Sequence, residues 1–348
     1  MESVVRRPAG SKADGAHIAL APAVALLLAV VIATVLRGTT GWFENSTSVD
    51  SKYESLAALP PVGVAAQEPP GPLRLVIPGL STQGRTLSAA FSTTAIFQGG
   101  AALVQVPDAV SGIVTVFGTT YQLNPAQDGS GARGYFGIGV LHPAGPTTVN
   151  VQATDIQGAT TSISMPVTIL ATEWTVDYIT LPPGVGSGLT PEVVQAEEDL
   201  LAATYGSITS PRFTSSWQPP LEEMHVTGYF GEQRSFNGGT PSGHHGGTDL
   251  GALEGTAVHA TNAGTVVIAR ELAVRGNMVI IDHGGGVFSS YAHLFRIDVT
   301  EGQEVAAGQV IGGVGTTGLS TGNHLHWEIA VFGILVDGLR WLDGSQGF

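Results

Sequence analysis

Most of this chain consists of short runs in which every second residue is apolar, and glycine, proline, asparagine or aspartate separates one run from the next. In the clearest run, Ile163, Met165, Val167 and Ile169 occupy alternate positions, which is the pattern of a strand with one buried face. The 348 residues include 48 glycines and 20 prolines, which favour turns over long helices. We therefore predict a mainly β protein.

Two regions carry these runs. Residues 71–172 hold short runs at close intervals, which predict a β-sandwich-like domain. This region has no cluster of titratable residues, so we expect it to act as a spacer or to bind a protein partner. Residues 222–342 form the second β region, and a tail, residues 343–348, follows it. Within the second region, 278–282 and 287–292 read as strands, and the glycines between them predict a hairpin.

A connecting segment, residues 173–221, joins the two β regions and contains one predicted helix over residues 190–205. Thr190 suits the N-cap position and Pro191 suits the first helical position. Gly206 can end the helix. The expected order is therefore β-sandwich, short helix, and a second β domain.

An apolar run near the N-terminus predicts a transmembrane helix. Residues 18–36 carry no charge, and about 20 residues are enough to cross a hydrocarbon core of roughly 30 Å. Three of the four basic residues nearby precede the run, which places residues 1–17 in the cytoplasm and the rest of the chain outside it. Residues 37–70 are polar and proline-rich and read as a linker. The alternative is a cleaved signal peptide, but the run is longer than a usual signal sequence, so we favour a single-pass anchor in the cell membrane.

Composition excludes several classes of function. The chain has 14 Lys and Arg residues against 28 Asp and Glu, a formal charge of −14, whereas nucleic-acid binding needs a basic surface. We expect no nucleic-acid partner. The absence of cysteine excludes disulfides, a thiol nucleophile and thiolate ligands. A metal ion would have to be held by histidines and carboxylates.

Histidines are concentrated in the second β region, where eight of the ten lie between His225 and His326. Imidazole nitrogens and carboxylate oxygens are good zinc ligands. His245 and Asp249 are four residues apart with two glycines between them, and this flexible spacing lets both converge on one ion. His244 is an alternative to His245 at this site.

Two further histidine patterns fall on predicted strands. Residues two apart on a strand face the same side, so His324 and His326 are expected to face a common cleft while Leu325 faces the core. By the same rule, Tyr291 and His293 are expected to share one face. Three ligands and an open position define a catalytic zinc site, but spacing alone does not tell which of His324 and His326 would bind the metal.

Residues 222–342 resemble the LytM/lysostaphin-type zinc metallopeptidases, peptidase family M23. The resemblance rests on three sequence elements that occur in the family's order: H-x-G-x-D, Y-x-H-L and G-x-H-L-H. The resemblance implies a small, mostly antiparallel β fold with an open groove. It also implies an endopeptidase whose substrate is the peptide part of bacterial cell-wall peptidoglycan. The helix and the β domain before it are similar, more loosely, to the upstream region of some membrane-anchored members.

The resemblance also assigns roles to residues. It implies that His245, Asp249 and His326 bind one Zn²⁺ per chain, and that His293 and His324 are catalytic without binding the metal. The implied reaction is peptide hydrolysis by a metal-activated water.

Two residues outside the implied zinc and catalytic set have possible roles near it. Glu328 lies on the same strand face as His326 by strict alternation and can orient that imidazole. Arg234 can pair with an acid or reach a substrate.

Two other functions stay open on the sequence. One is a catalytically inactive relative that binds a partner or activates another cell-wall hydrolase. The other is a structural protein that spans the wall, which leaves the histidine cluster without a role.

Overall fold

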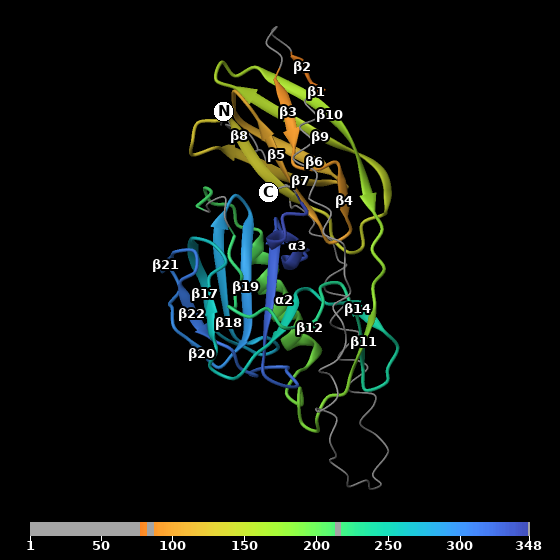
Figure 1. Cartoon of the computed structure of the whole chain (residues 1–348), viewed down its shortest axis with the longest axis vertical. Coiled ribbons are helices and arrows are strands. Elements are labelled where there is room, and N and C mark those ends of the chain that lie inside the picture. Colours follow the sequence, from red (N-terminus) through yellow and green to blue (C-terminus); the bar gives the residue numbers. More distant parts are fainter. Residues whose placement is uncertain (1–76, 82–86, 213–216, 347–348) are drawn as a thin grey trace, which may run out of the picture.

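The computed structural model describes residues 77–81, 87–212 and 217–346 (Figure 1). The predicted cytoplasmic segment, transmembrane helix (18–36) and linker, which together make up residues 1–70, lie outside these ranges. Among the helices that are described, none is both long and apolar enough to cross a membrane. The described part of the chain is mainly β, as predicted.

The first β region forms a ten-stranded network in the order β1-β3-β5-β8-β7-β6-β9-β10-β2, with β4 paired to β10. Along β10 every second residue from Thr161 to Ile169 is buried and the residues between them are exposed. Val104 on β5 and Ile163 on β10 belong to one apolar core although their strands lie far apart in this order. The network therefore folds into two facing layers, the sandwich-like arrangement that the alternation predicts. Its strands are β1 (Ile77–Pro78), β2 (Leu80–Ser81), β3 (Ser88–Phe91), β4 (Ala95–Phe97), β5 (Ala101–Val106), β6 (Ala109–Val116), β7 (Thr119–Pro125), β8 (Ala132–Gly137), β9 (Gly145–Asp155) and β10 (Thr160–Leu170).

The second β region is built on an eight-stranded antiparallel sheet in the order β12-β15-β23-β19-β18-β17-β21, with β24 paired to β23. A three-stranded sheet, β16-β22-β20, accompanies it. The predicted hairpin is present as β18 and β19. The strands are β12 (Val226–Gly228), β15 (Thr248–Gly251), β16 (Ala257–His259), β17 (Gly264–Leu272), β18 (Gly276–Gly284), β19 (Val287–Leu294), β20 (Arg296–Ile297), β21 (Glu304–Val305), β22 (Val310–Gly313), β23 (His324–Val331) and β24 (Ile334–Val336).

The predicted helix is α2 (Pro191–Tyr205), and its N-terminus forms as expected. The Oγ1 of Thr190 accepts a hydrogen bond from the backbone N–H of Val193. Gly206 ends the helix with a right-handed backbone, φ −80°, so the left-handed freedom of glycine is not used there.

The central strands of the eight-stranded sheet are buried on both faces. Trp327 and Ile329 on β23 point into the main core of the protein. On the opposite face, Phe288 on β19 packs with Leu201 and Tyr205 of α2. The helix thus supplies the second cover of the sheet, and it lies beside β19 in Figure 1.

The connecting segment adds a strand as well as a helix to the second region. β11 (Val176–Ile179) pairs in parallel with β13 (Gln233–Phe236), which pairs with β14 (Ser242–His244). Both the strand and the helix of the predicted connector are therefore bound to the structure that follows it.

The two β regions pack directly on each other. Phe332 lies edge-on to Tyr121 of the first region, with ring centroids 5.4 Å apart. Gln346 accepts a hydrogen bond at its side-chain oxygen from the backbone N–H of Ala101. The short helix α3 (Gly338–Leu342) lies between the regions in Figure 1.

Candidate metal centre

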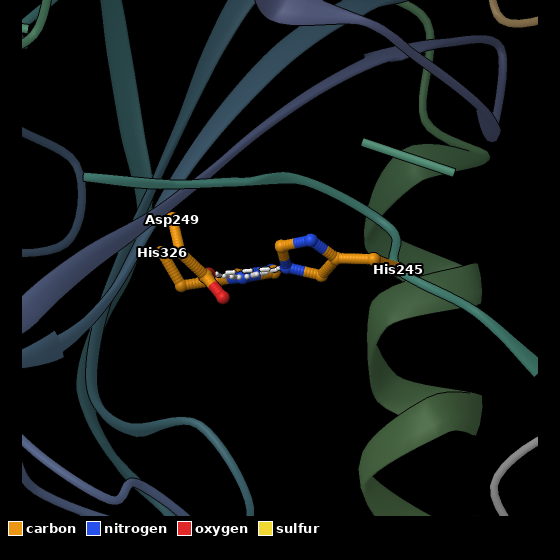
Figure 2. A group of neighbouring side chains, drawn as sticks. All are labelled: His245, Asp249 and His326. Atoms are coloured by element: carbon orange, nitrogen blue, oxygen red, sulfur yellow. Dashed lines mark hydrogen bonds and ion pairs between the residues drawn. The ribbon is translucent and has the colours of Figure 1, made fainter. Parts of the chain in front are cut away.

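The three side chains implied as metal ligands meet at one point beside the eight-stranded sheet (Figure 2). His245 Nε2 lies 3.0 Å from Asp249 Oδ1 and 3.0 Å from His326 Nδ1, and the last two atoms are 2.8 Å apart. In a tetrahedral zinc site with bonds of about 2.0–2.1 Å, ligand atoms lie about 3.3 Å apart. The spacing of the three atoms therefore suits an ion of this size.

Strand pairing places two of these residues on one face. Asp249 on β15 is directly opposite His326 on β23, and opposed residues of antiparallel strands point to the same side. His245 comes from the turn before β15, where the chain passes close to β23. A Cβ on Gly247 would lie 2.5 Å from the backbone oxygen of Trp327, so only glycine fits this approach.

Hydrogen bonds outside the cluster fix which ring nitrogens face inward. His245 Nδ1 lies 2.9 Å from the carbonyl oxygen of Tyr229, and His326 Nε2 lies 3.0 Å from Glu328 Oε1. Both oxygens can only accept, so these nitrogens donate, and in neutral rings His245 Nε2 and His326 Nδ1 carry lone pairs. Two lone pairs and a carboxylate oxygen that face one point repel one another unless a proton or a metal ion lies between them. This donor set fits a divalent metal.

Two buried carboxylates, Asp249 and Glu328, set the electrostatics of the site. Burial disfavours the charged form of His326, but hydrogen bonds to Asp249 and Glu328 outweigh burial and raise the pKa of His326 to about 9. Burial also opposes ionisation of Asp249, yet the neighbouring histidines hold the pKa of Asp249 well below its ordinary value. A proton and a metal ion therefore compete for the Nδ1 of His326.

Arg234 on β13 pairs with an acid, one of its two predicted roles. Its Nη2 donates to Asp249 Oδ2 over 2.8 Å, and its Nε lies 3.6 Å from Asp177 on β11. The guanidinium occupies one carboxylate oxygen of Asp249, which leaves Oδ1 to face the two histidines.

Glu328 lies on the face of His326, as strict alternation predicts. Its residue is 1% exposed, and its Oε2 accepts a hydrogen bond of 2.9 Å from the hydroxyl of Tyr205. Burial opposes ionisation, but Arg275 and His326 outweigh it and lower the pKa of Glu328 to about 2. The carboxylate is charged and holds the outer nitrogen of His326.

His293 and His324 lie beside this cluster, with their rings tilted by 47° and the ring centroids 4.8 Å apart. His293 Nδ1 lies 2.8 Å from the carbonyl oxygen of Thr317, and His324 Nδ1 lies 2.8 Å from that of Gly322. Both rings therefore donate from Nδ1 and keep a bare Nε2. His324 Nε2 is 3.7 Å from Asp249 Oδ1, at the edge of the cluster.

The prediction that Tyr291 and His293 share one face is wrong. Tyr291 points into the main core and its hydroxyl bonds to Thr261. His293 has a left-handed backbone, φ 60°, at the end of β19, and this turns its ring to the side of His326, 5.9 Å away. The two-residue alternation fails because it holds only while the backbone stays extended.

The structure also decides between neighbouring candidates and adds residues. His244 stays outside the cluster, with its Nδ1 2.7 Å from the carbonyl oxygen of Gly231. Sequence reasoning missed Tyr205, Arg275 and Ser290, which surround Glu328. Nothing in their local sequence marks them, because Tyr205 reaches Glu328 through the packing of α2 on the sheet, and Ser290 and Arg275 lie on or beside other strands of that sheet.

Part of the chain is similar to known proteins. Residues 243–338 match the family model for peptidase family M23. Peptidoglycan DD-endopeptidase ShyA of Vibrio cholerae is 43% identical over 96 residues, which are 28% of this chain and 22% of that protein. Murein hydrolase activator NlpD of Escherichia coli is 37% identical over 129 residues, 37% of this chain and 31% of that protein. The matched part is thus no more than about a third of either relative.

A crystal structure of a putative peptidase M23 from Pseudomonas aeruginosa extends the likeness in fold. It covers 71% of this chain and 94% of its own, with a TM-score of 0.53 and 23% sequence identity. The shared fold therefore reaches beyond the residues that match the family model. Together with the family match, these findings show that this chain contains a peptidase family M23 domain over residues 243–338.

Proposed function

We propose that this protein is a zinc-dependent endopeptidase that hydrolyses peptide bonds of bacterial cell-wall peptidoglycan. The observation that carries the proposal is the set of three donor atoms of His245, Asp249 and His326, all within 3.0 Å of one another, with two further imidazoles beside them. The likeness to a peptidoglycan DD-endopeptidase supports the substrate.

The residues of the chain divide the work of hydrolysis. When bound, zinc supplies Lewis acidity, which lowers the pKa of water and polarises the scissile carbonyl. Burial lowers the pKa of both His293 and His324, that of His293 to about 3, so both rings are neutral at pH 7. The bare Nε2 of His324, the more exposed ring, accepts the proton of the attacking water and returns it to the leaving amine. In this proposal His293 is a second proton acceptor beside His324, because its Nδ1 already donates to Thr317 and its bare Nε2 can only accept.

Digestion of purified peptidoglycan, with mass analysis of the released peptides, tests this function and identifies the bond that is cut. We expect release by the wild-type protein, loss of release after chelation, and recovery with added zinc. His326→Ala is expected to abolish release. Activity that survives both chelation and His326→Ala would contradict the metal mechanism.

A second candidate is activation of another cell-wall hydrolase, which the likeness to the murein hydrolase activator NlpD favours. An activator releases no peptides by itself but increases release by an added hydrolase. Zinc content, measured on the purified protein by mass spectrometry, separates the two: about one ion per chain supports the enzyme, and none supports the activator.

We also propose that residues 18–36 anchor the chain in the cell membrane with the metal centre outside the cytoplasm, where peptidoglycan lies. The uncharged apolar run and the basic residues before it support this topology. Protease added to cells with a permeable wall is expected to degrade the second β region. In this arrangement the first β region, residues 71–172, binds a protein partner through the surface that the second β region leaves uncovered.

A further inference from the structure

Helix α2 lies before the residues that match the family model, yet it covers the face of the sheet that carries the metal centre. On this face Ala292 is opposite His326, and Ser290 is opposite Glu328. Leu201 and Tyr205 of the helix pack on the same face. The helix is therefore in position to act on the residues that hold the metal ligands.

The hydroxyl of Tyr205 makes two hydrogen bonds beneath the centre. It lies 2.9 Å from Glu328 Oε2 and 2.6 Å from Ser290 Oγ. A carboxylate only accepts, so Tyr205 donates to Glu328 and accepts from Ser290. The ring of Tyr205 packs against Phe288 with centroids 5.6 Å apart, which fixes the hydroxyl in place independently of Glu328.

The same helix also places a cation beside Glu328. Glu197 and Glu198 of α2 lie 3.3 Å and 3.0 Å from Arg275 Nη1. The other terminal nitrogen of Arg275, Nη2, is 3.6 Å from Glu328 Oε1. The helix thus holds the carboxylate of Glu328 twice, directly at Oε2 and through Arg275 at Oε1.

We infer that Tyr205 is a positioning residue of the metal centre, which holds Glu328 so that Glu328 holds His326 with its Nδ1 directed at the ion. This inference rests on the proposed zinc-dependent function. Without the hydroxyl, Glu328 Oε2 is left buried with no donor from the helix, and Arg275 alone restrains the carboxylate from turning away from His326 Nε2. When the carboxylate turns, the imidazole loses the bond that fixes its tautomer. Outer partners of this kind contribute about 10–100-fold to metal affinity.

Zinc affinity of the full-length protein, measured by competition with a coloured chelator, tests the inference. Tyr205→Phe keeps the packed ring and removes only the hydroxyl, and we expect a 10–100-fold weaker affinity. The matched control is Tyr121→Phe in the first β region, which removes the hydroxyl of another buried tyrosine, bonded to the carbonyl of Gly137. The control is expected to bind zinc as the wild type does.

A double-mutant cycle distinguishes positioning through Glu328 from a general loss of structure. Glu328→Gln alone is expected to weaken zinc binding at least as much as Tyr205→Phe. In the Glu328→Gln background, Tyr205→Phe is expected to add less than about 3-fold, because its route to His326 is already broken. If the double variant loses zinc affinity by the full product of the two single losses, the inference is wrong.

The outcomes separate this inference from the proposed function. A wild-type affinity for zinc in Tyr205→Phe would overturn the inference and leave the zinc enzyme intact. A wild-type protein that binds no zinc would overturn the proposed function itself, and the inference with it. The visible spectrum of the Co²⁺-substituted protein gives a second readout, in which a change in Tyr205→Phe but not in Tyr121→Phe supports positioning.

Discussion

Strands β10 and β23 have similar alternating sequences but opposite surroundings. On β10 the residues between Ile163 and Ile169 that point away from the core are exposed to solvent. On β23 the residues that point away from the core include His326 and Glu328, and both are buried. The difference arises because α2 and the turn that carries His245 cover the second face of β23, whereas the second face of β10 stays open.

This comparison shows how a polar position on an amphipathic strand acquires chemistry. A serine or threonine on the outer face of β10 is solvated and needs no partner. A polar group on the covered face of β23 must find a partner inside the protein. Those partners fix the orientation of each ring and the charge of each carboxylate, which is what a metal site requires.

Replacement of an acid on the covered face should have the largest effect. Asp249→Ala removes one of three ligand atoms and leaves Arg234 without its closest carboxylate, so we expect zinc affinity to fall by about 1000-fold, or about 4 kcal/mol. Isothermal titration with zinc measures this loss. The matched control is Asp155→Ala in the first region, which removes an acid bonded to the backbone N–H groups of Gln157 and Ala159. It should reduce stability by about 1–3 kcal/mol and leave zinc binding unchanged.

Replacement of His293 should separate catalysis from metal binding. Asparagine tolerates the left-handed backbone of this position better than most residues, so His293→Asn is expected to fold and to bind zinc. Loss of the imidazole should lower the rate of peptide release by about 100-fold or more. Steady-state assays with a synthetic wall peptide, alongside zinc analysis, measure both. A parallel loss of bound zinc would show that His293 is itself a ligand.

A pair of neighbouring substitutions on β10 tests the open face. Ile163→Ala empties a buried position and should lower the free energy of unfolding by about 2–3 kcal/mol. Ser164→Ala, one residue on, lies on the exposed face and should change it by less than about 0.5 kcal/mol. Urea denaturation measures both. Equal effects would mean that the outer face of β10 is covered in solution, and the contrast with β23 would fail.

The smallest expected effect concerns the helix that covers the second face. Thr190→Ala removes the cap of α2 and should destabilise the protein by about 1 kcal/mol. Thermal unfolding measures this change, and a small loss of zinc affinity should accompany it if α2 supports the centre. Unchanged stability would show that packing alone holds the helix.

Much of the fold followed from local patterns. The alternation at Ile163–Ile169 predicted β10, the glycines after Asp282 predicted the hairpin, and Thr190 with Pro191 predicted the start of α2. Each pattern depends on residues close in sequence, whose backbone preferences act before any distant contact forms. The side chains of His324 and His326 were correctly expected on one face for the same reason.

Other features depended on contacts between distant parts of the chain. The left-handed backbone of His293 and the exclusion of His244 from the cluster have no local signal. The same holds for β11, which the sequence placed in a connector and which the structure pairs with β13.

The residues that can bind a metal were determined by the sequence, since only histidines and carboxylates were available and their order along the chain was specific. The tertiary structure decided which atom of each residue faces the ion. That choice depends on Tyr229, Glu328 and, through Glu328, on Tyr205, which hydrogen-bond from other elements. Residue type sets which groups can donate or accept, but the direction of a lone pair is set by the partner on the other side of the ring.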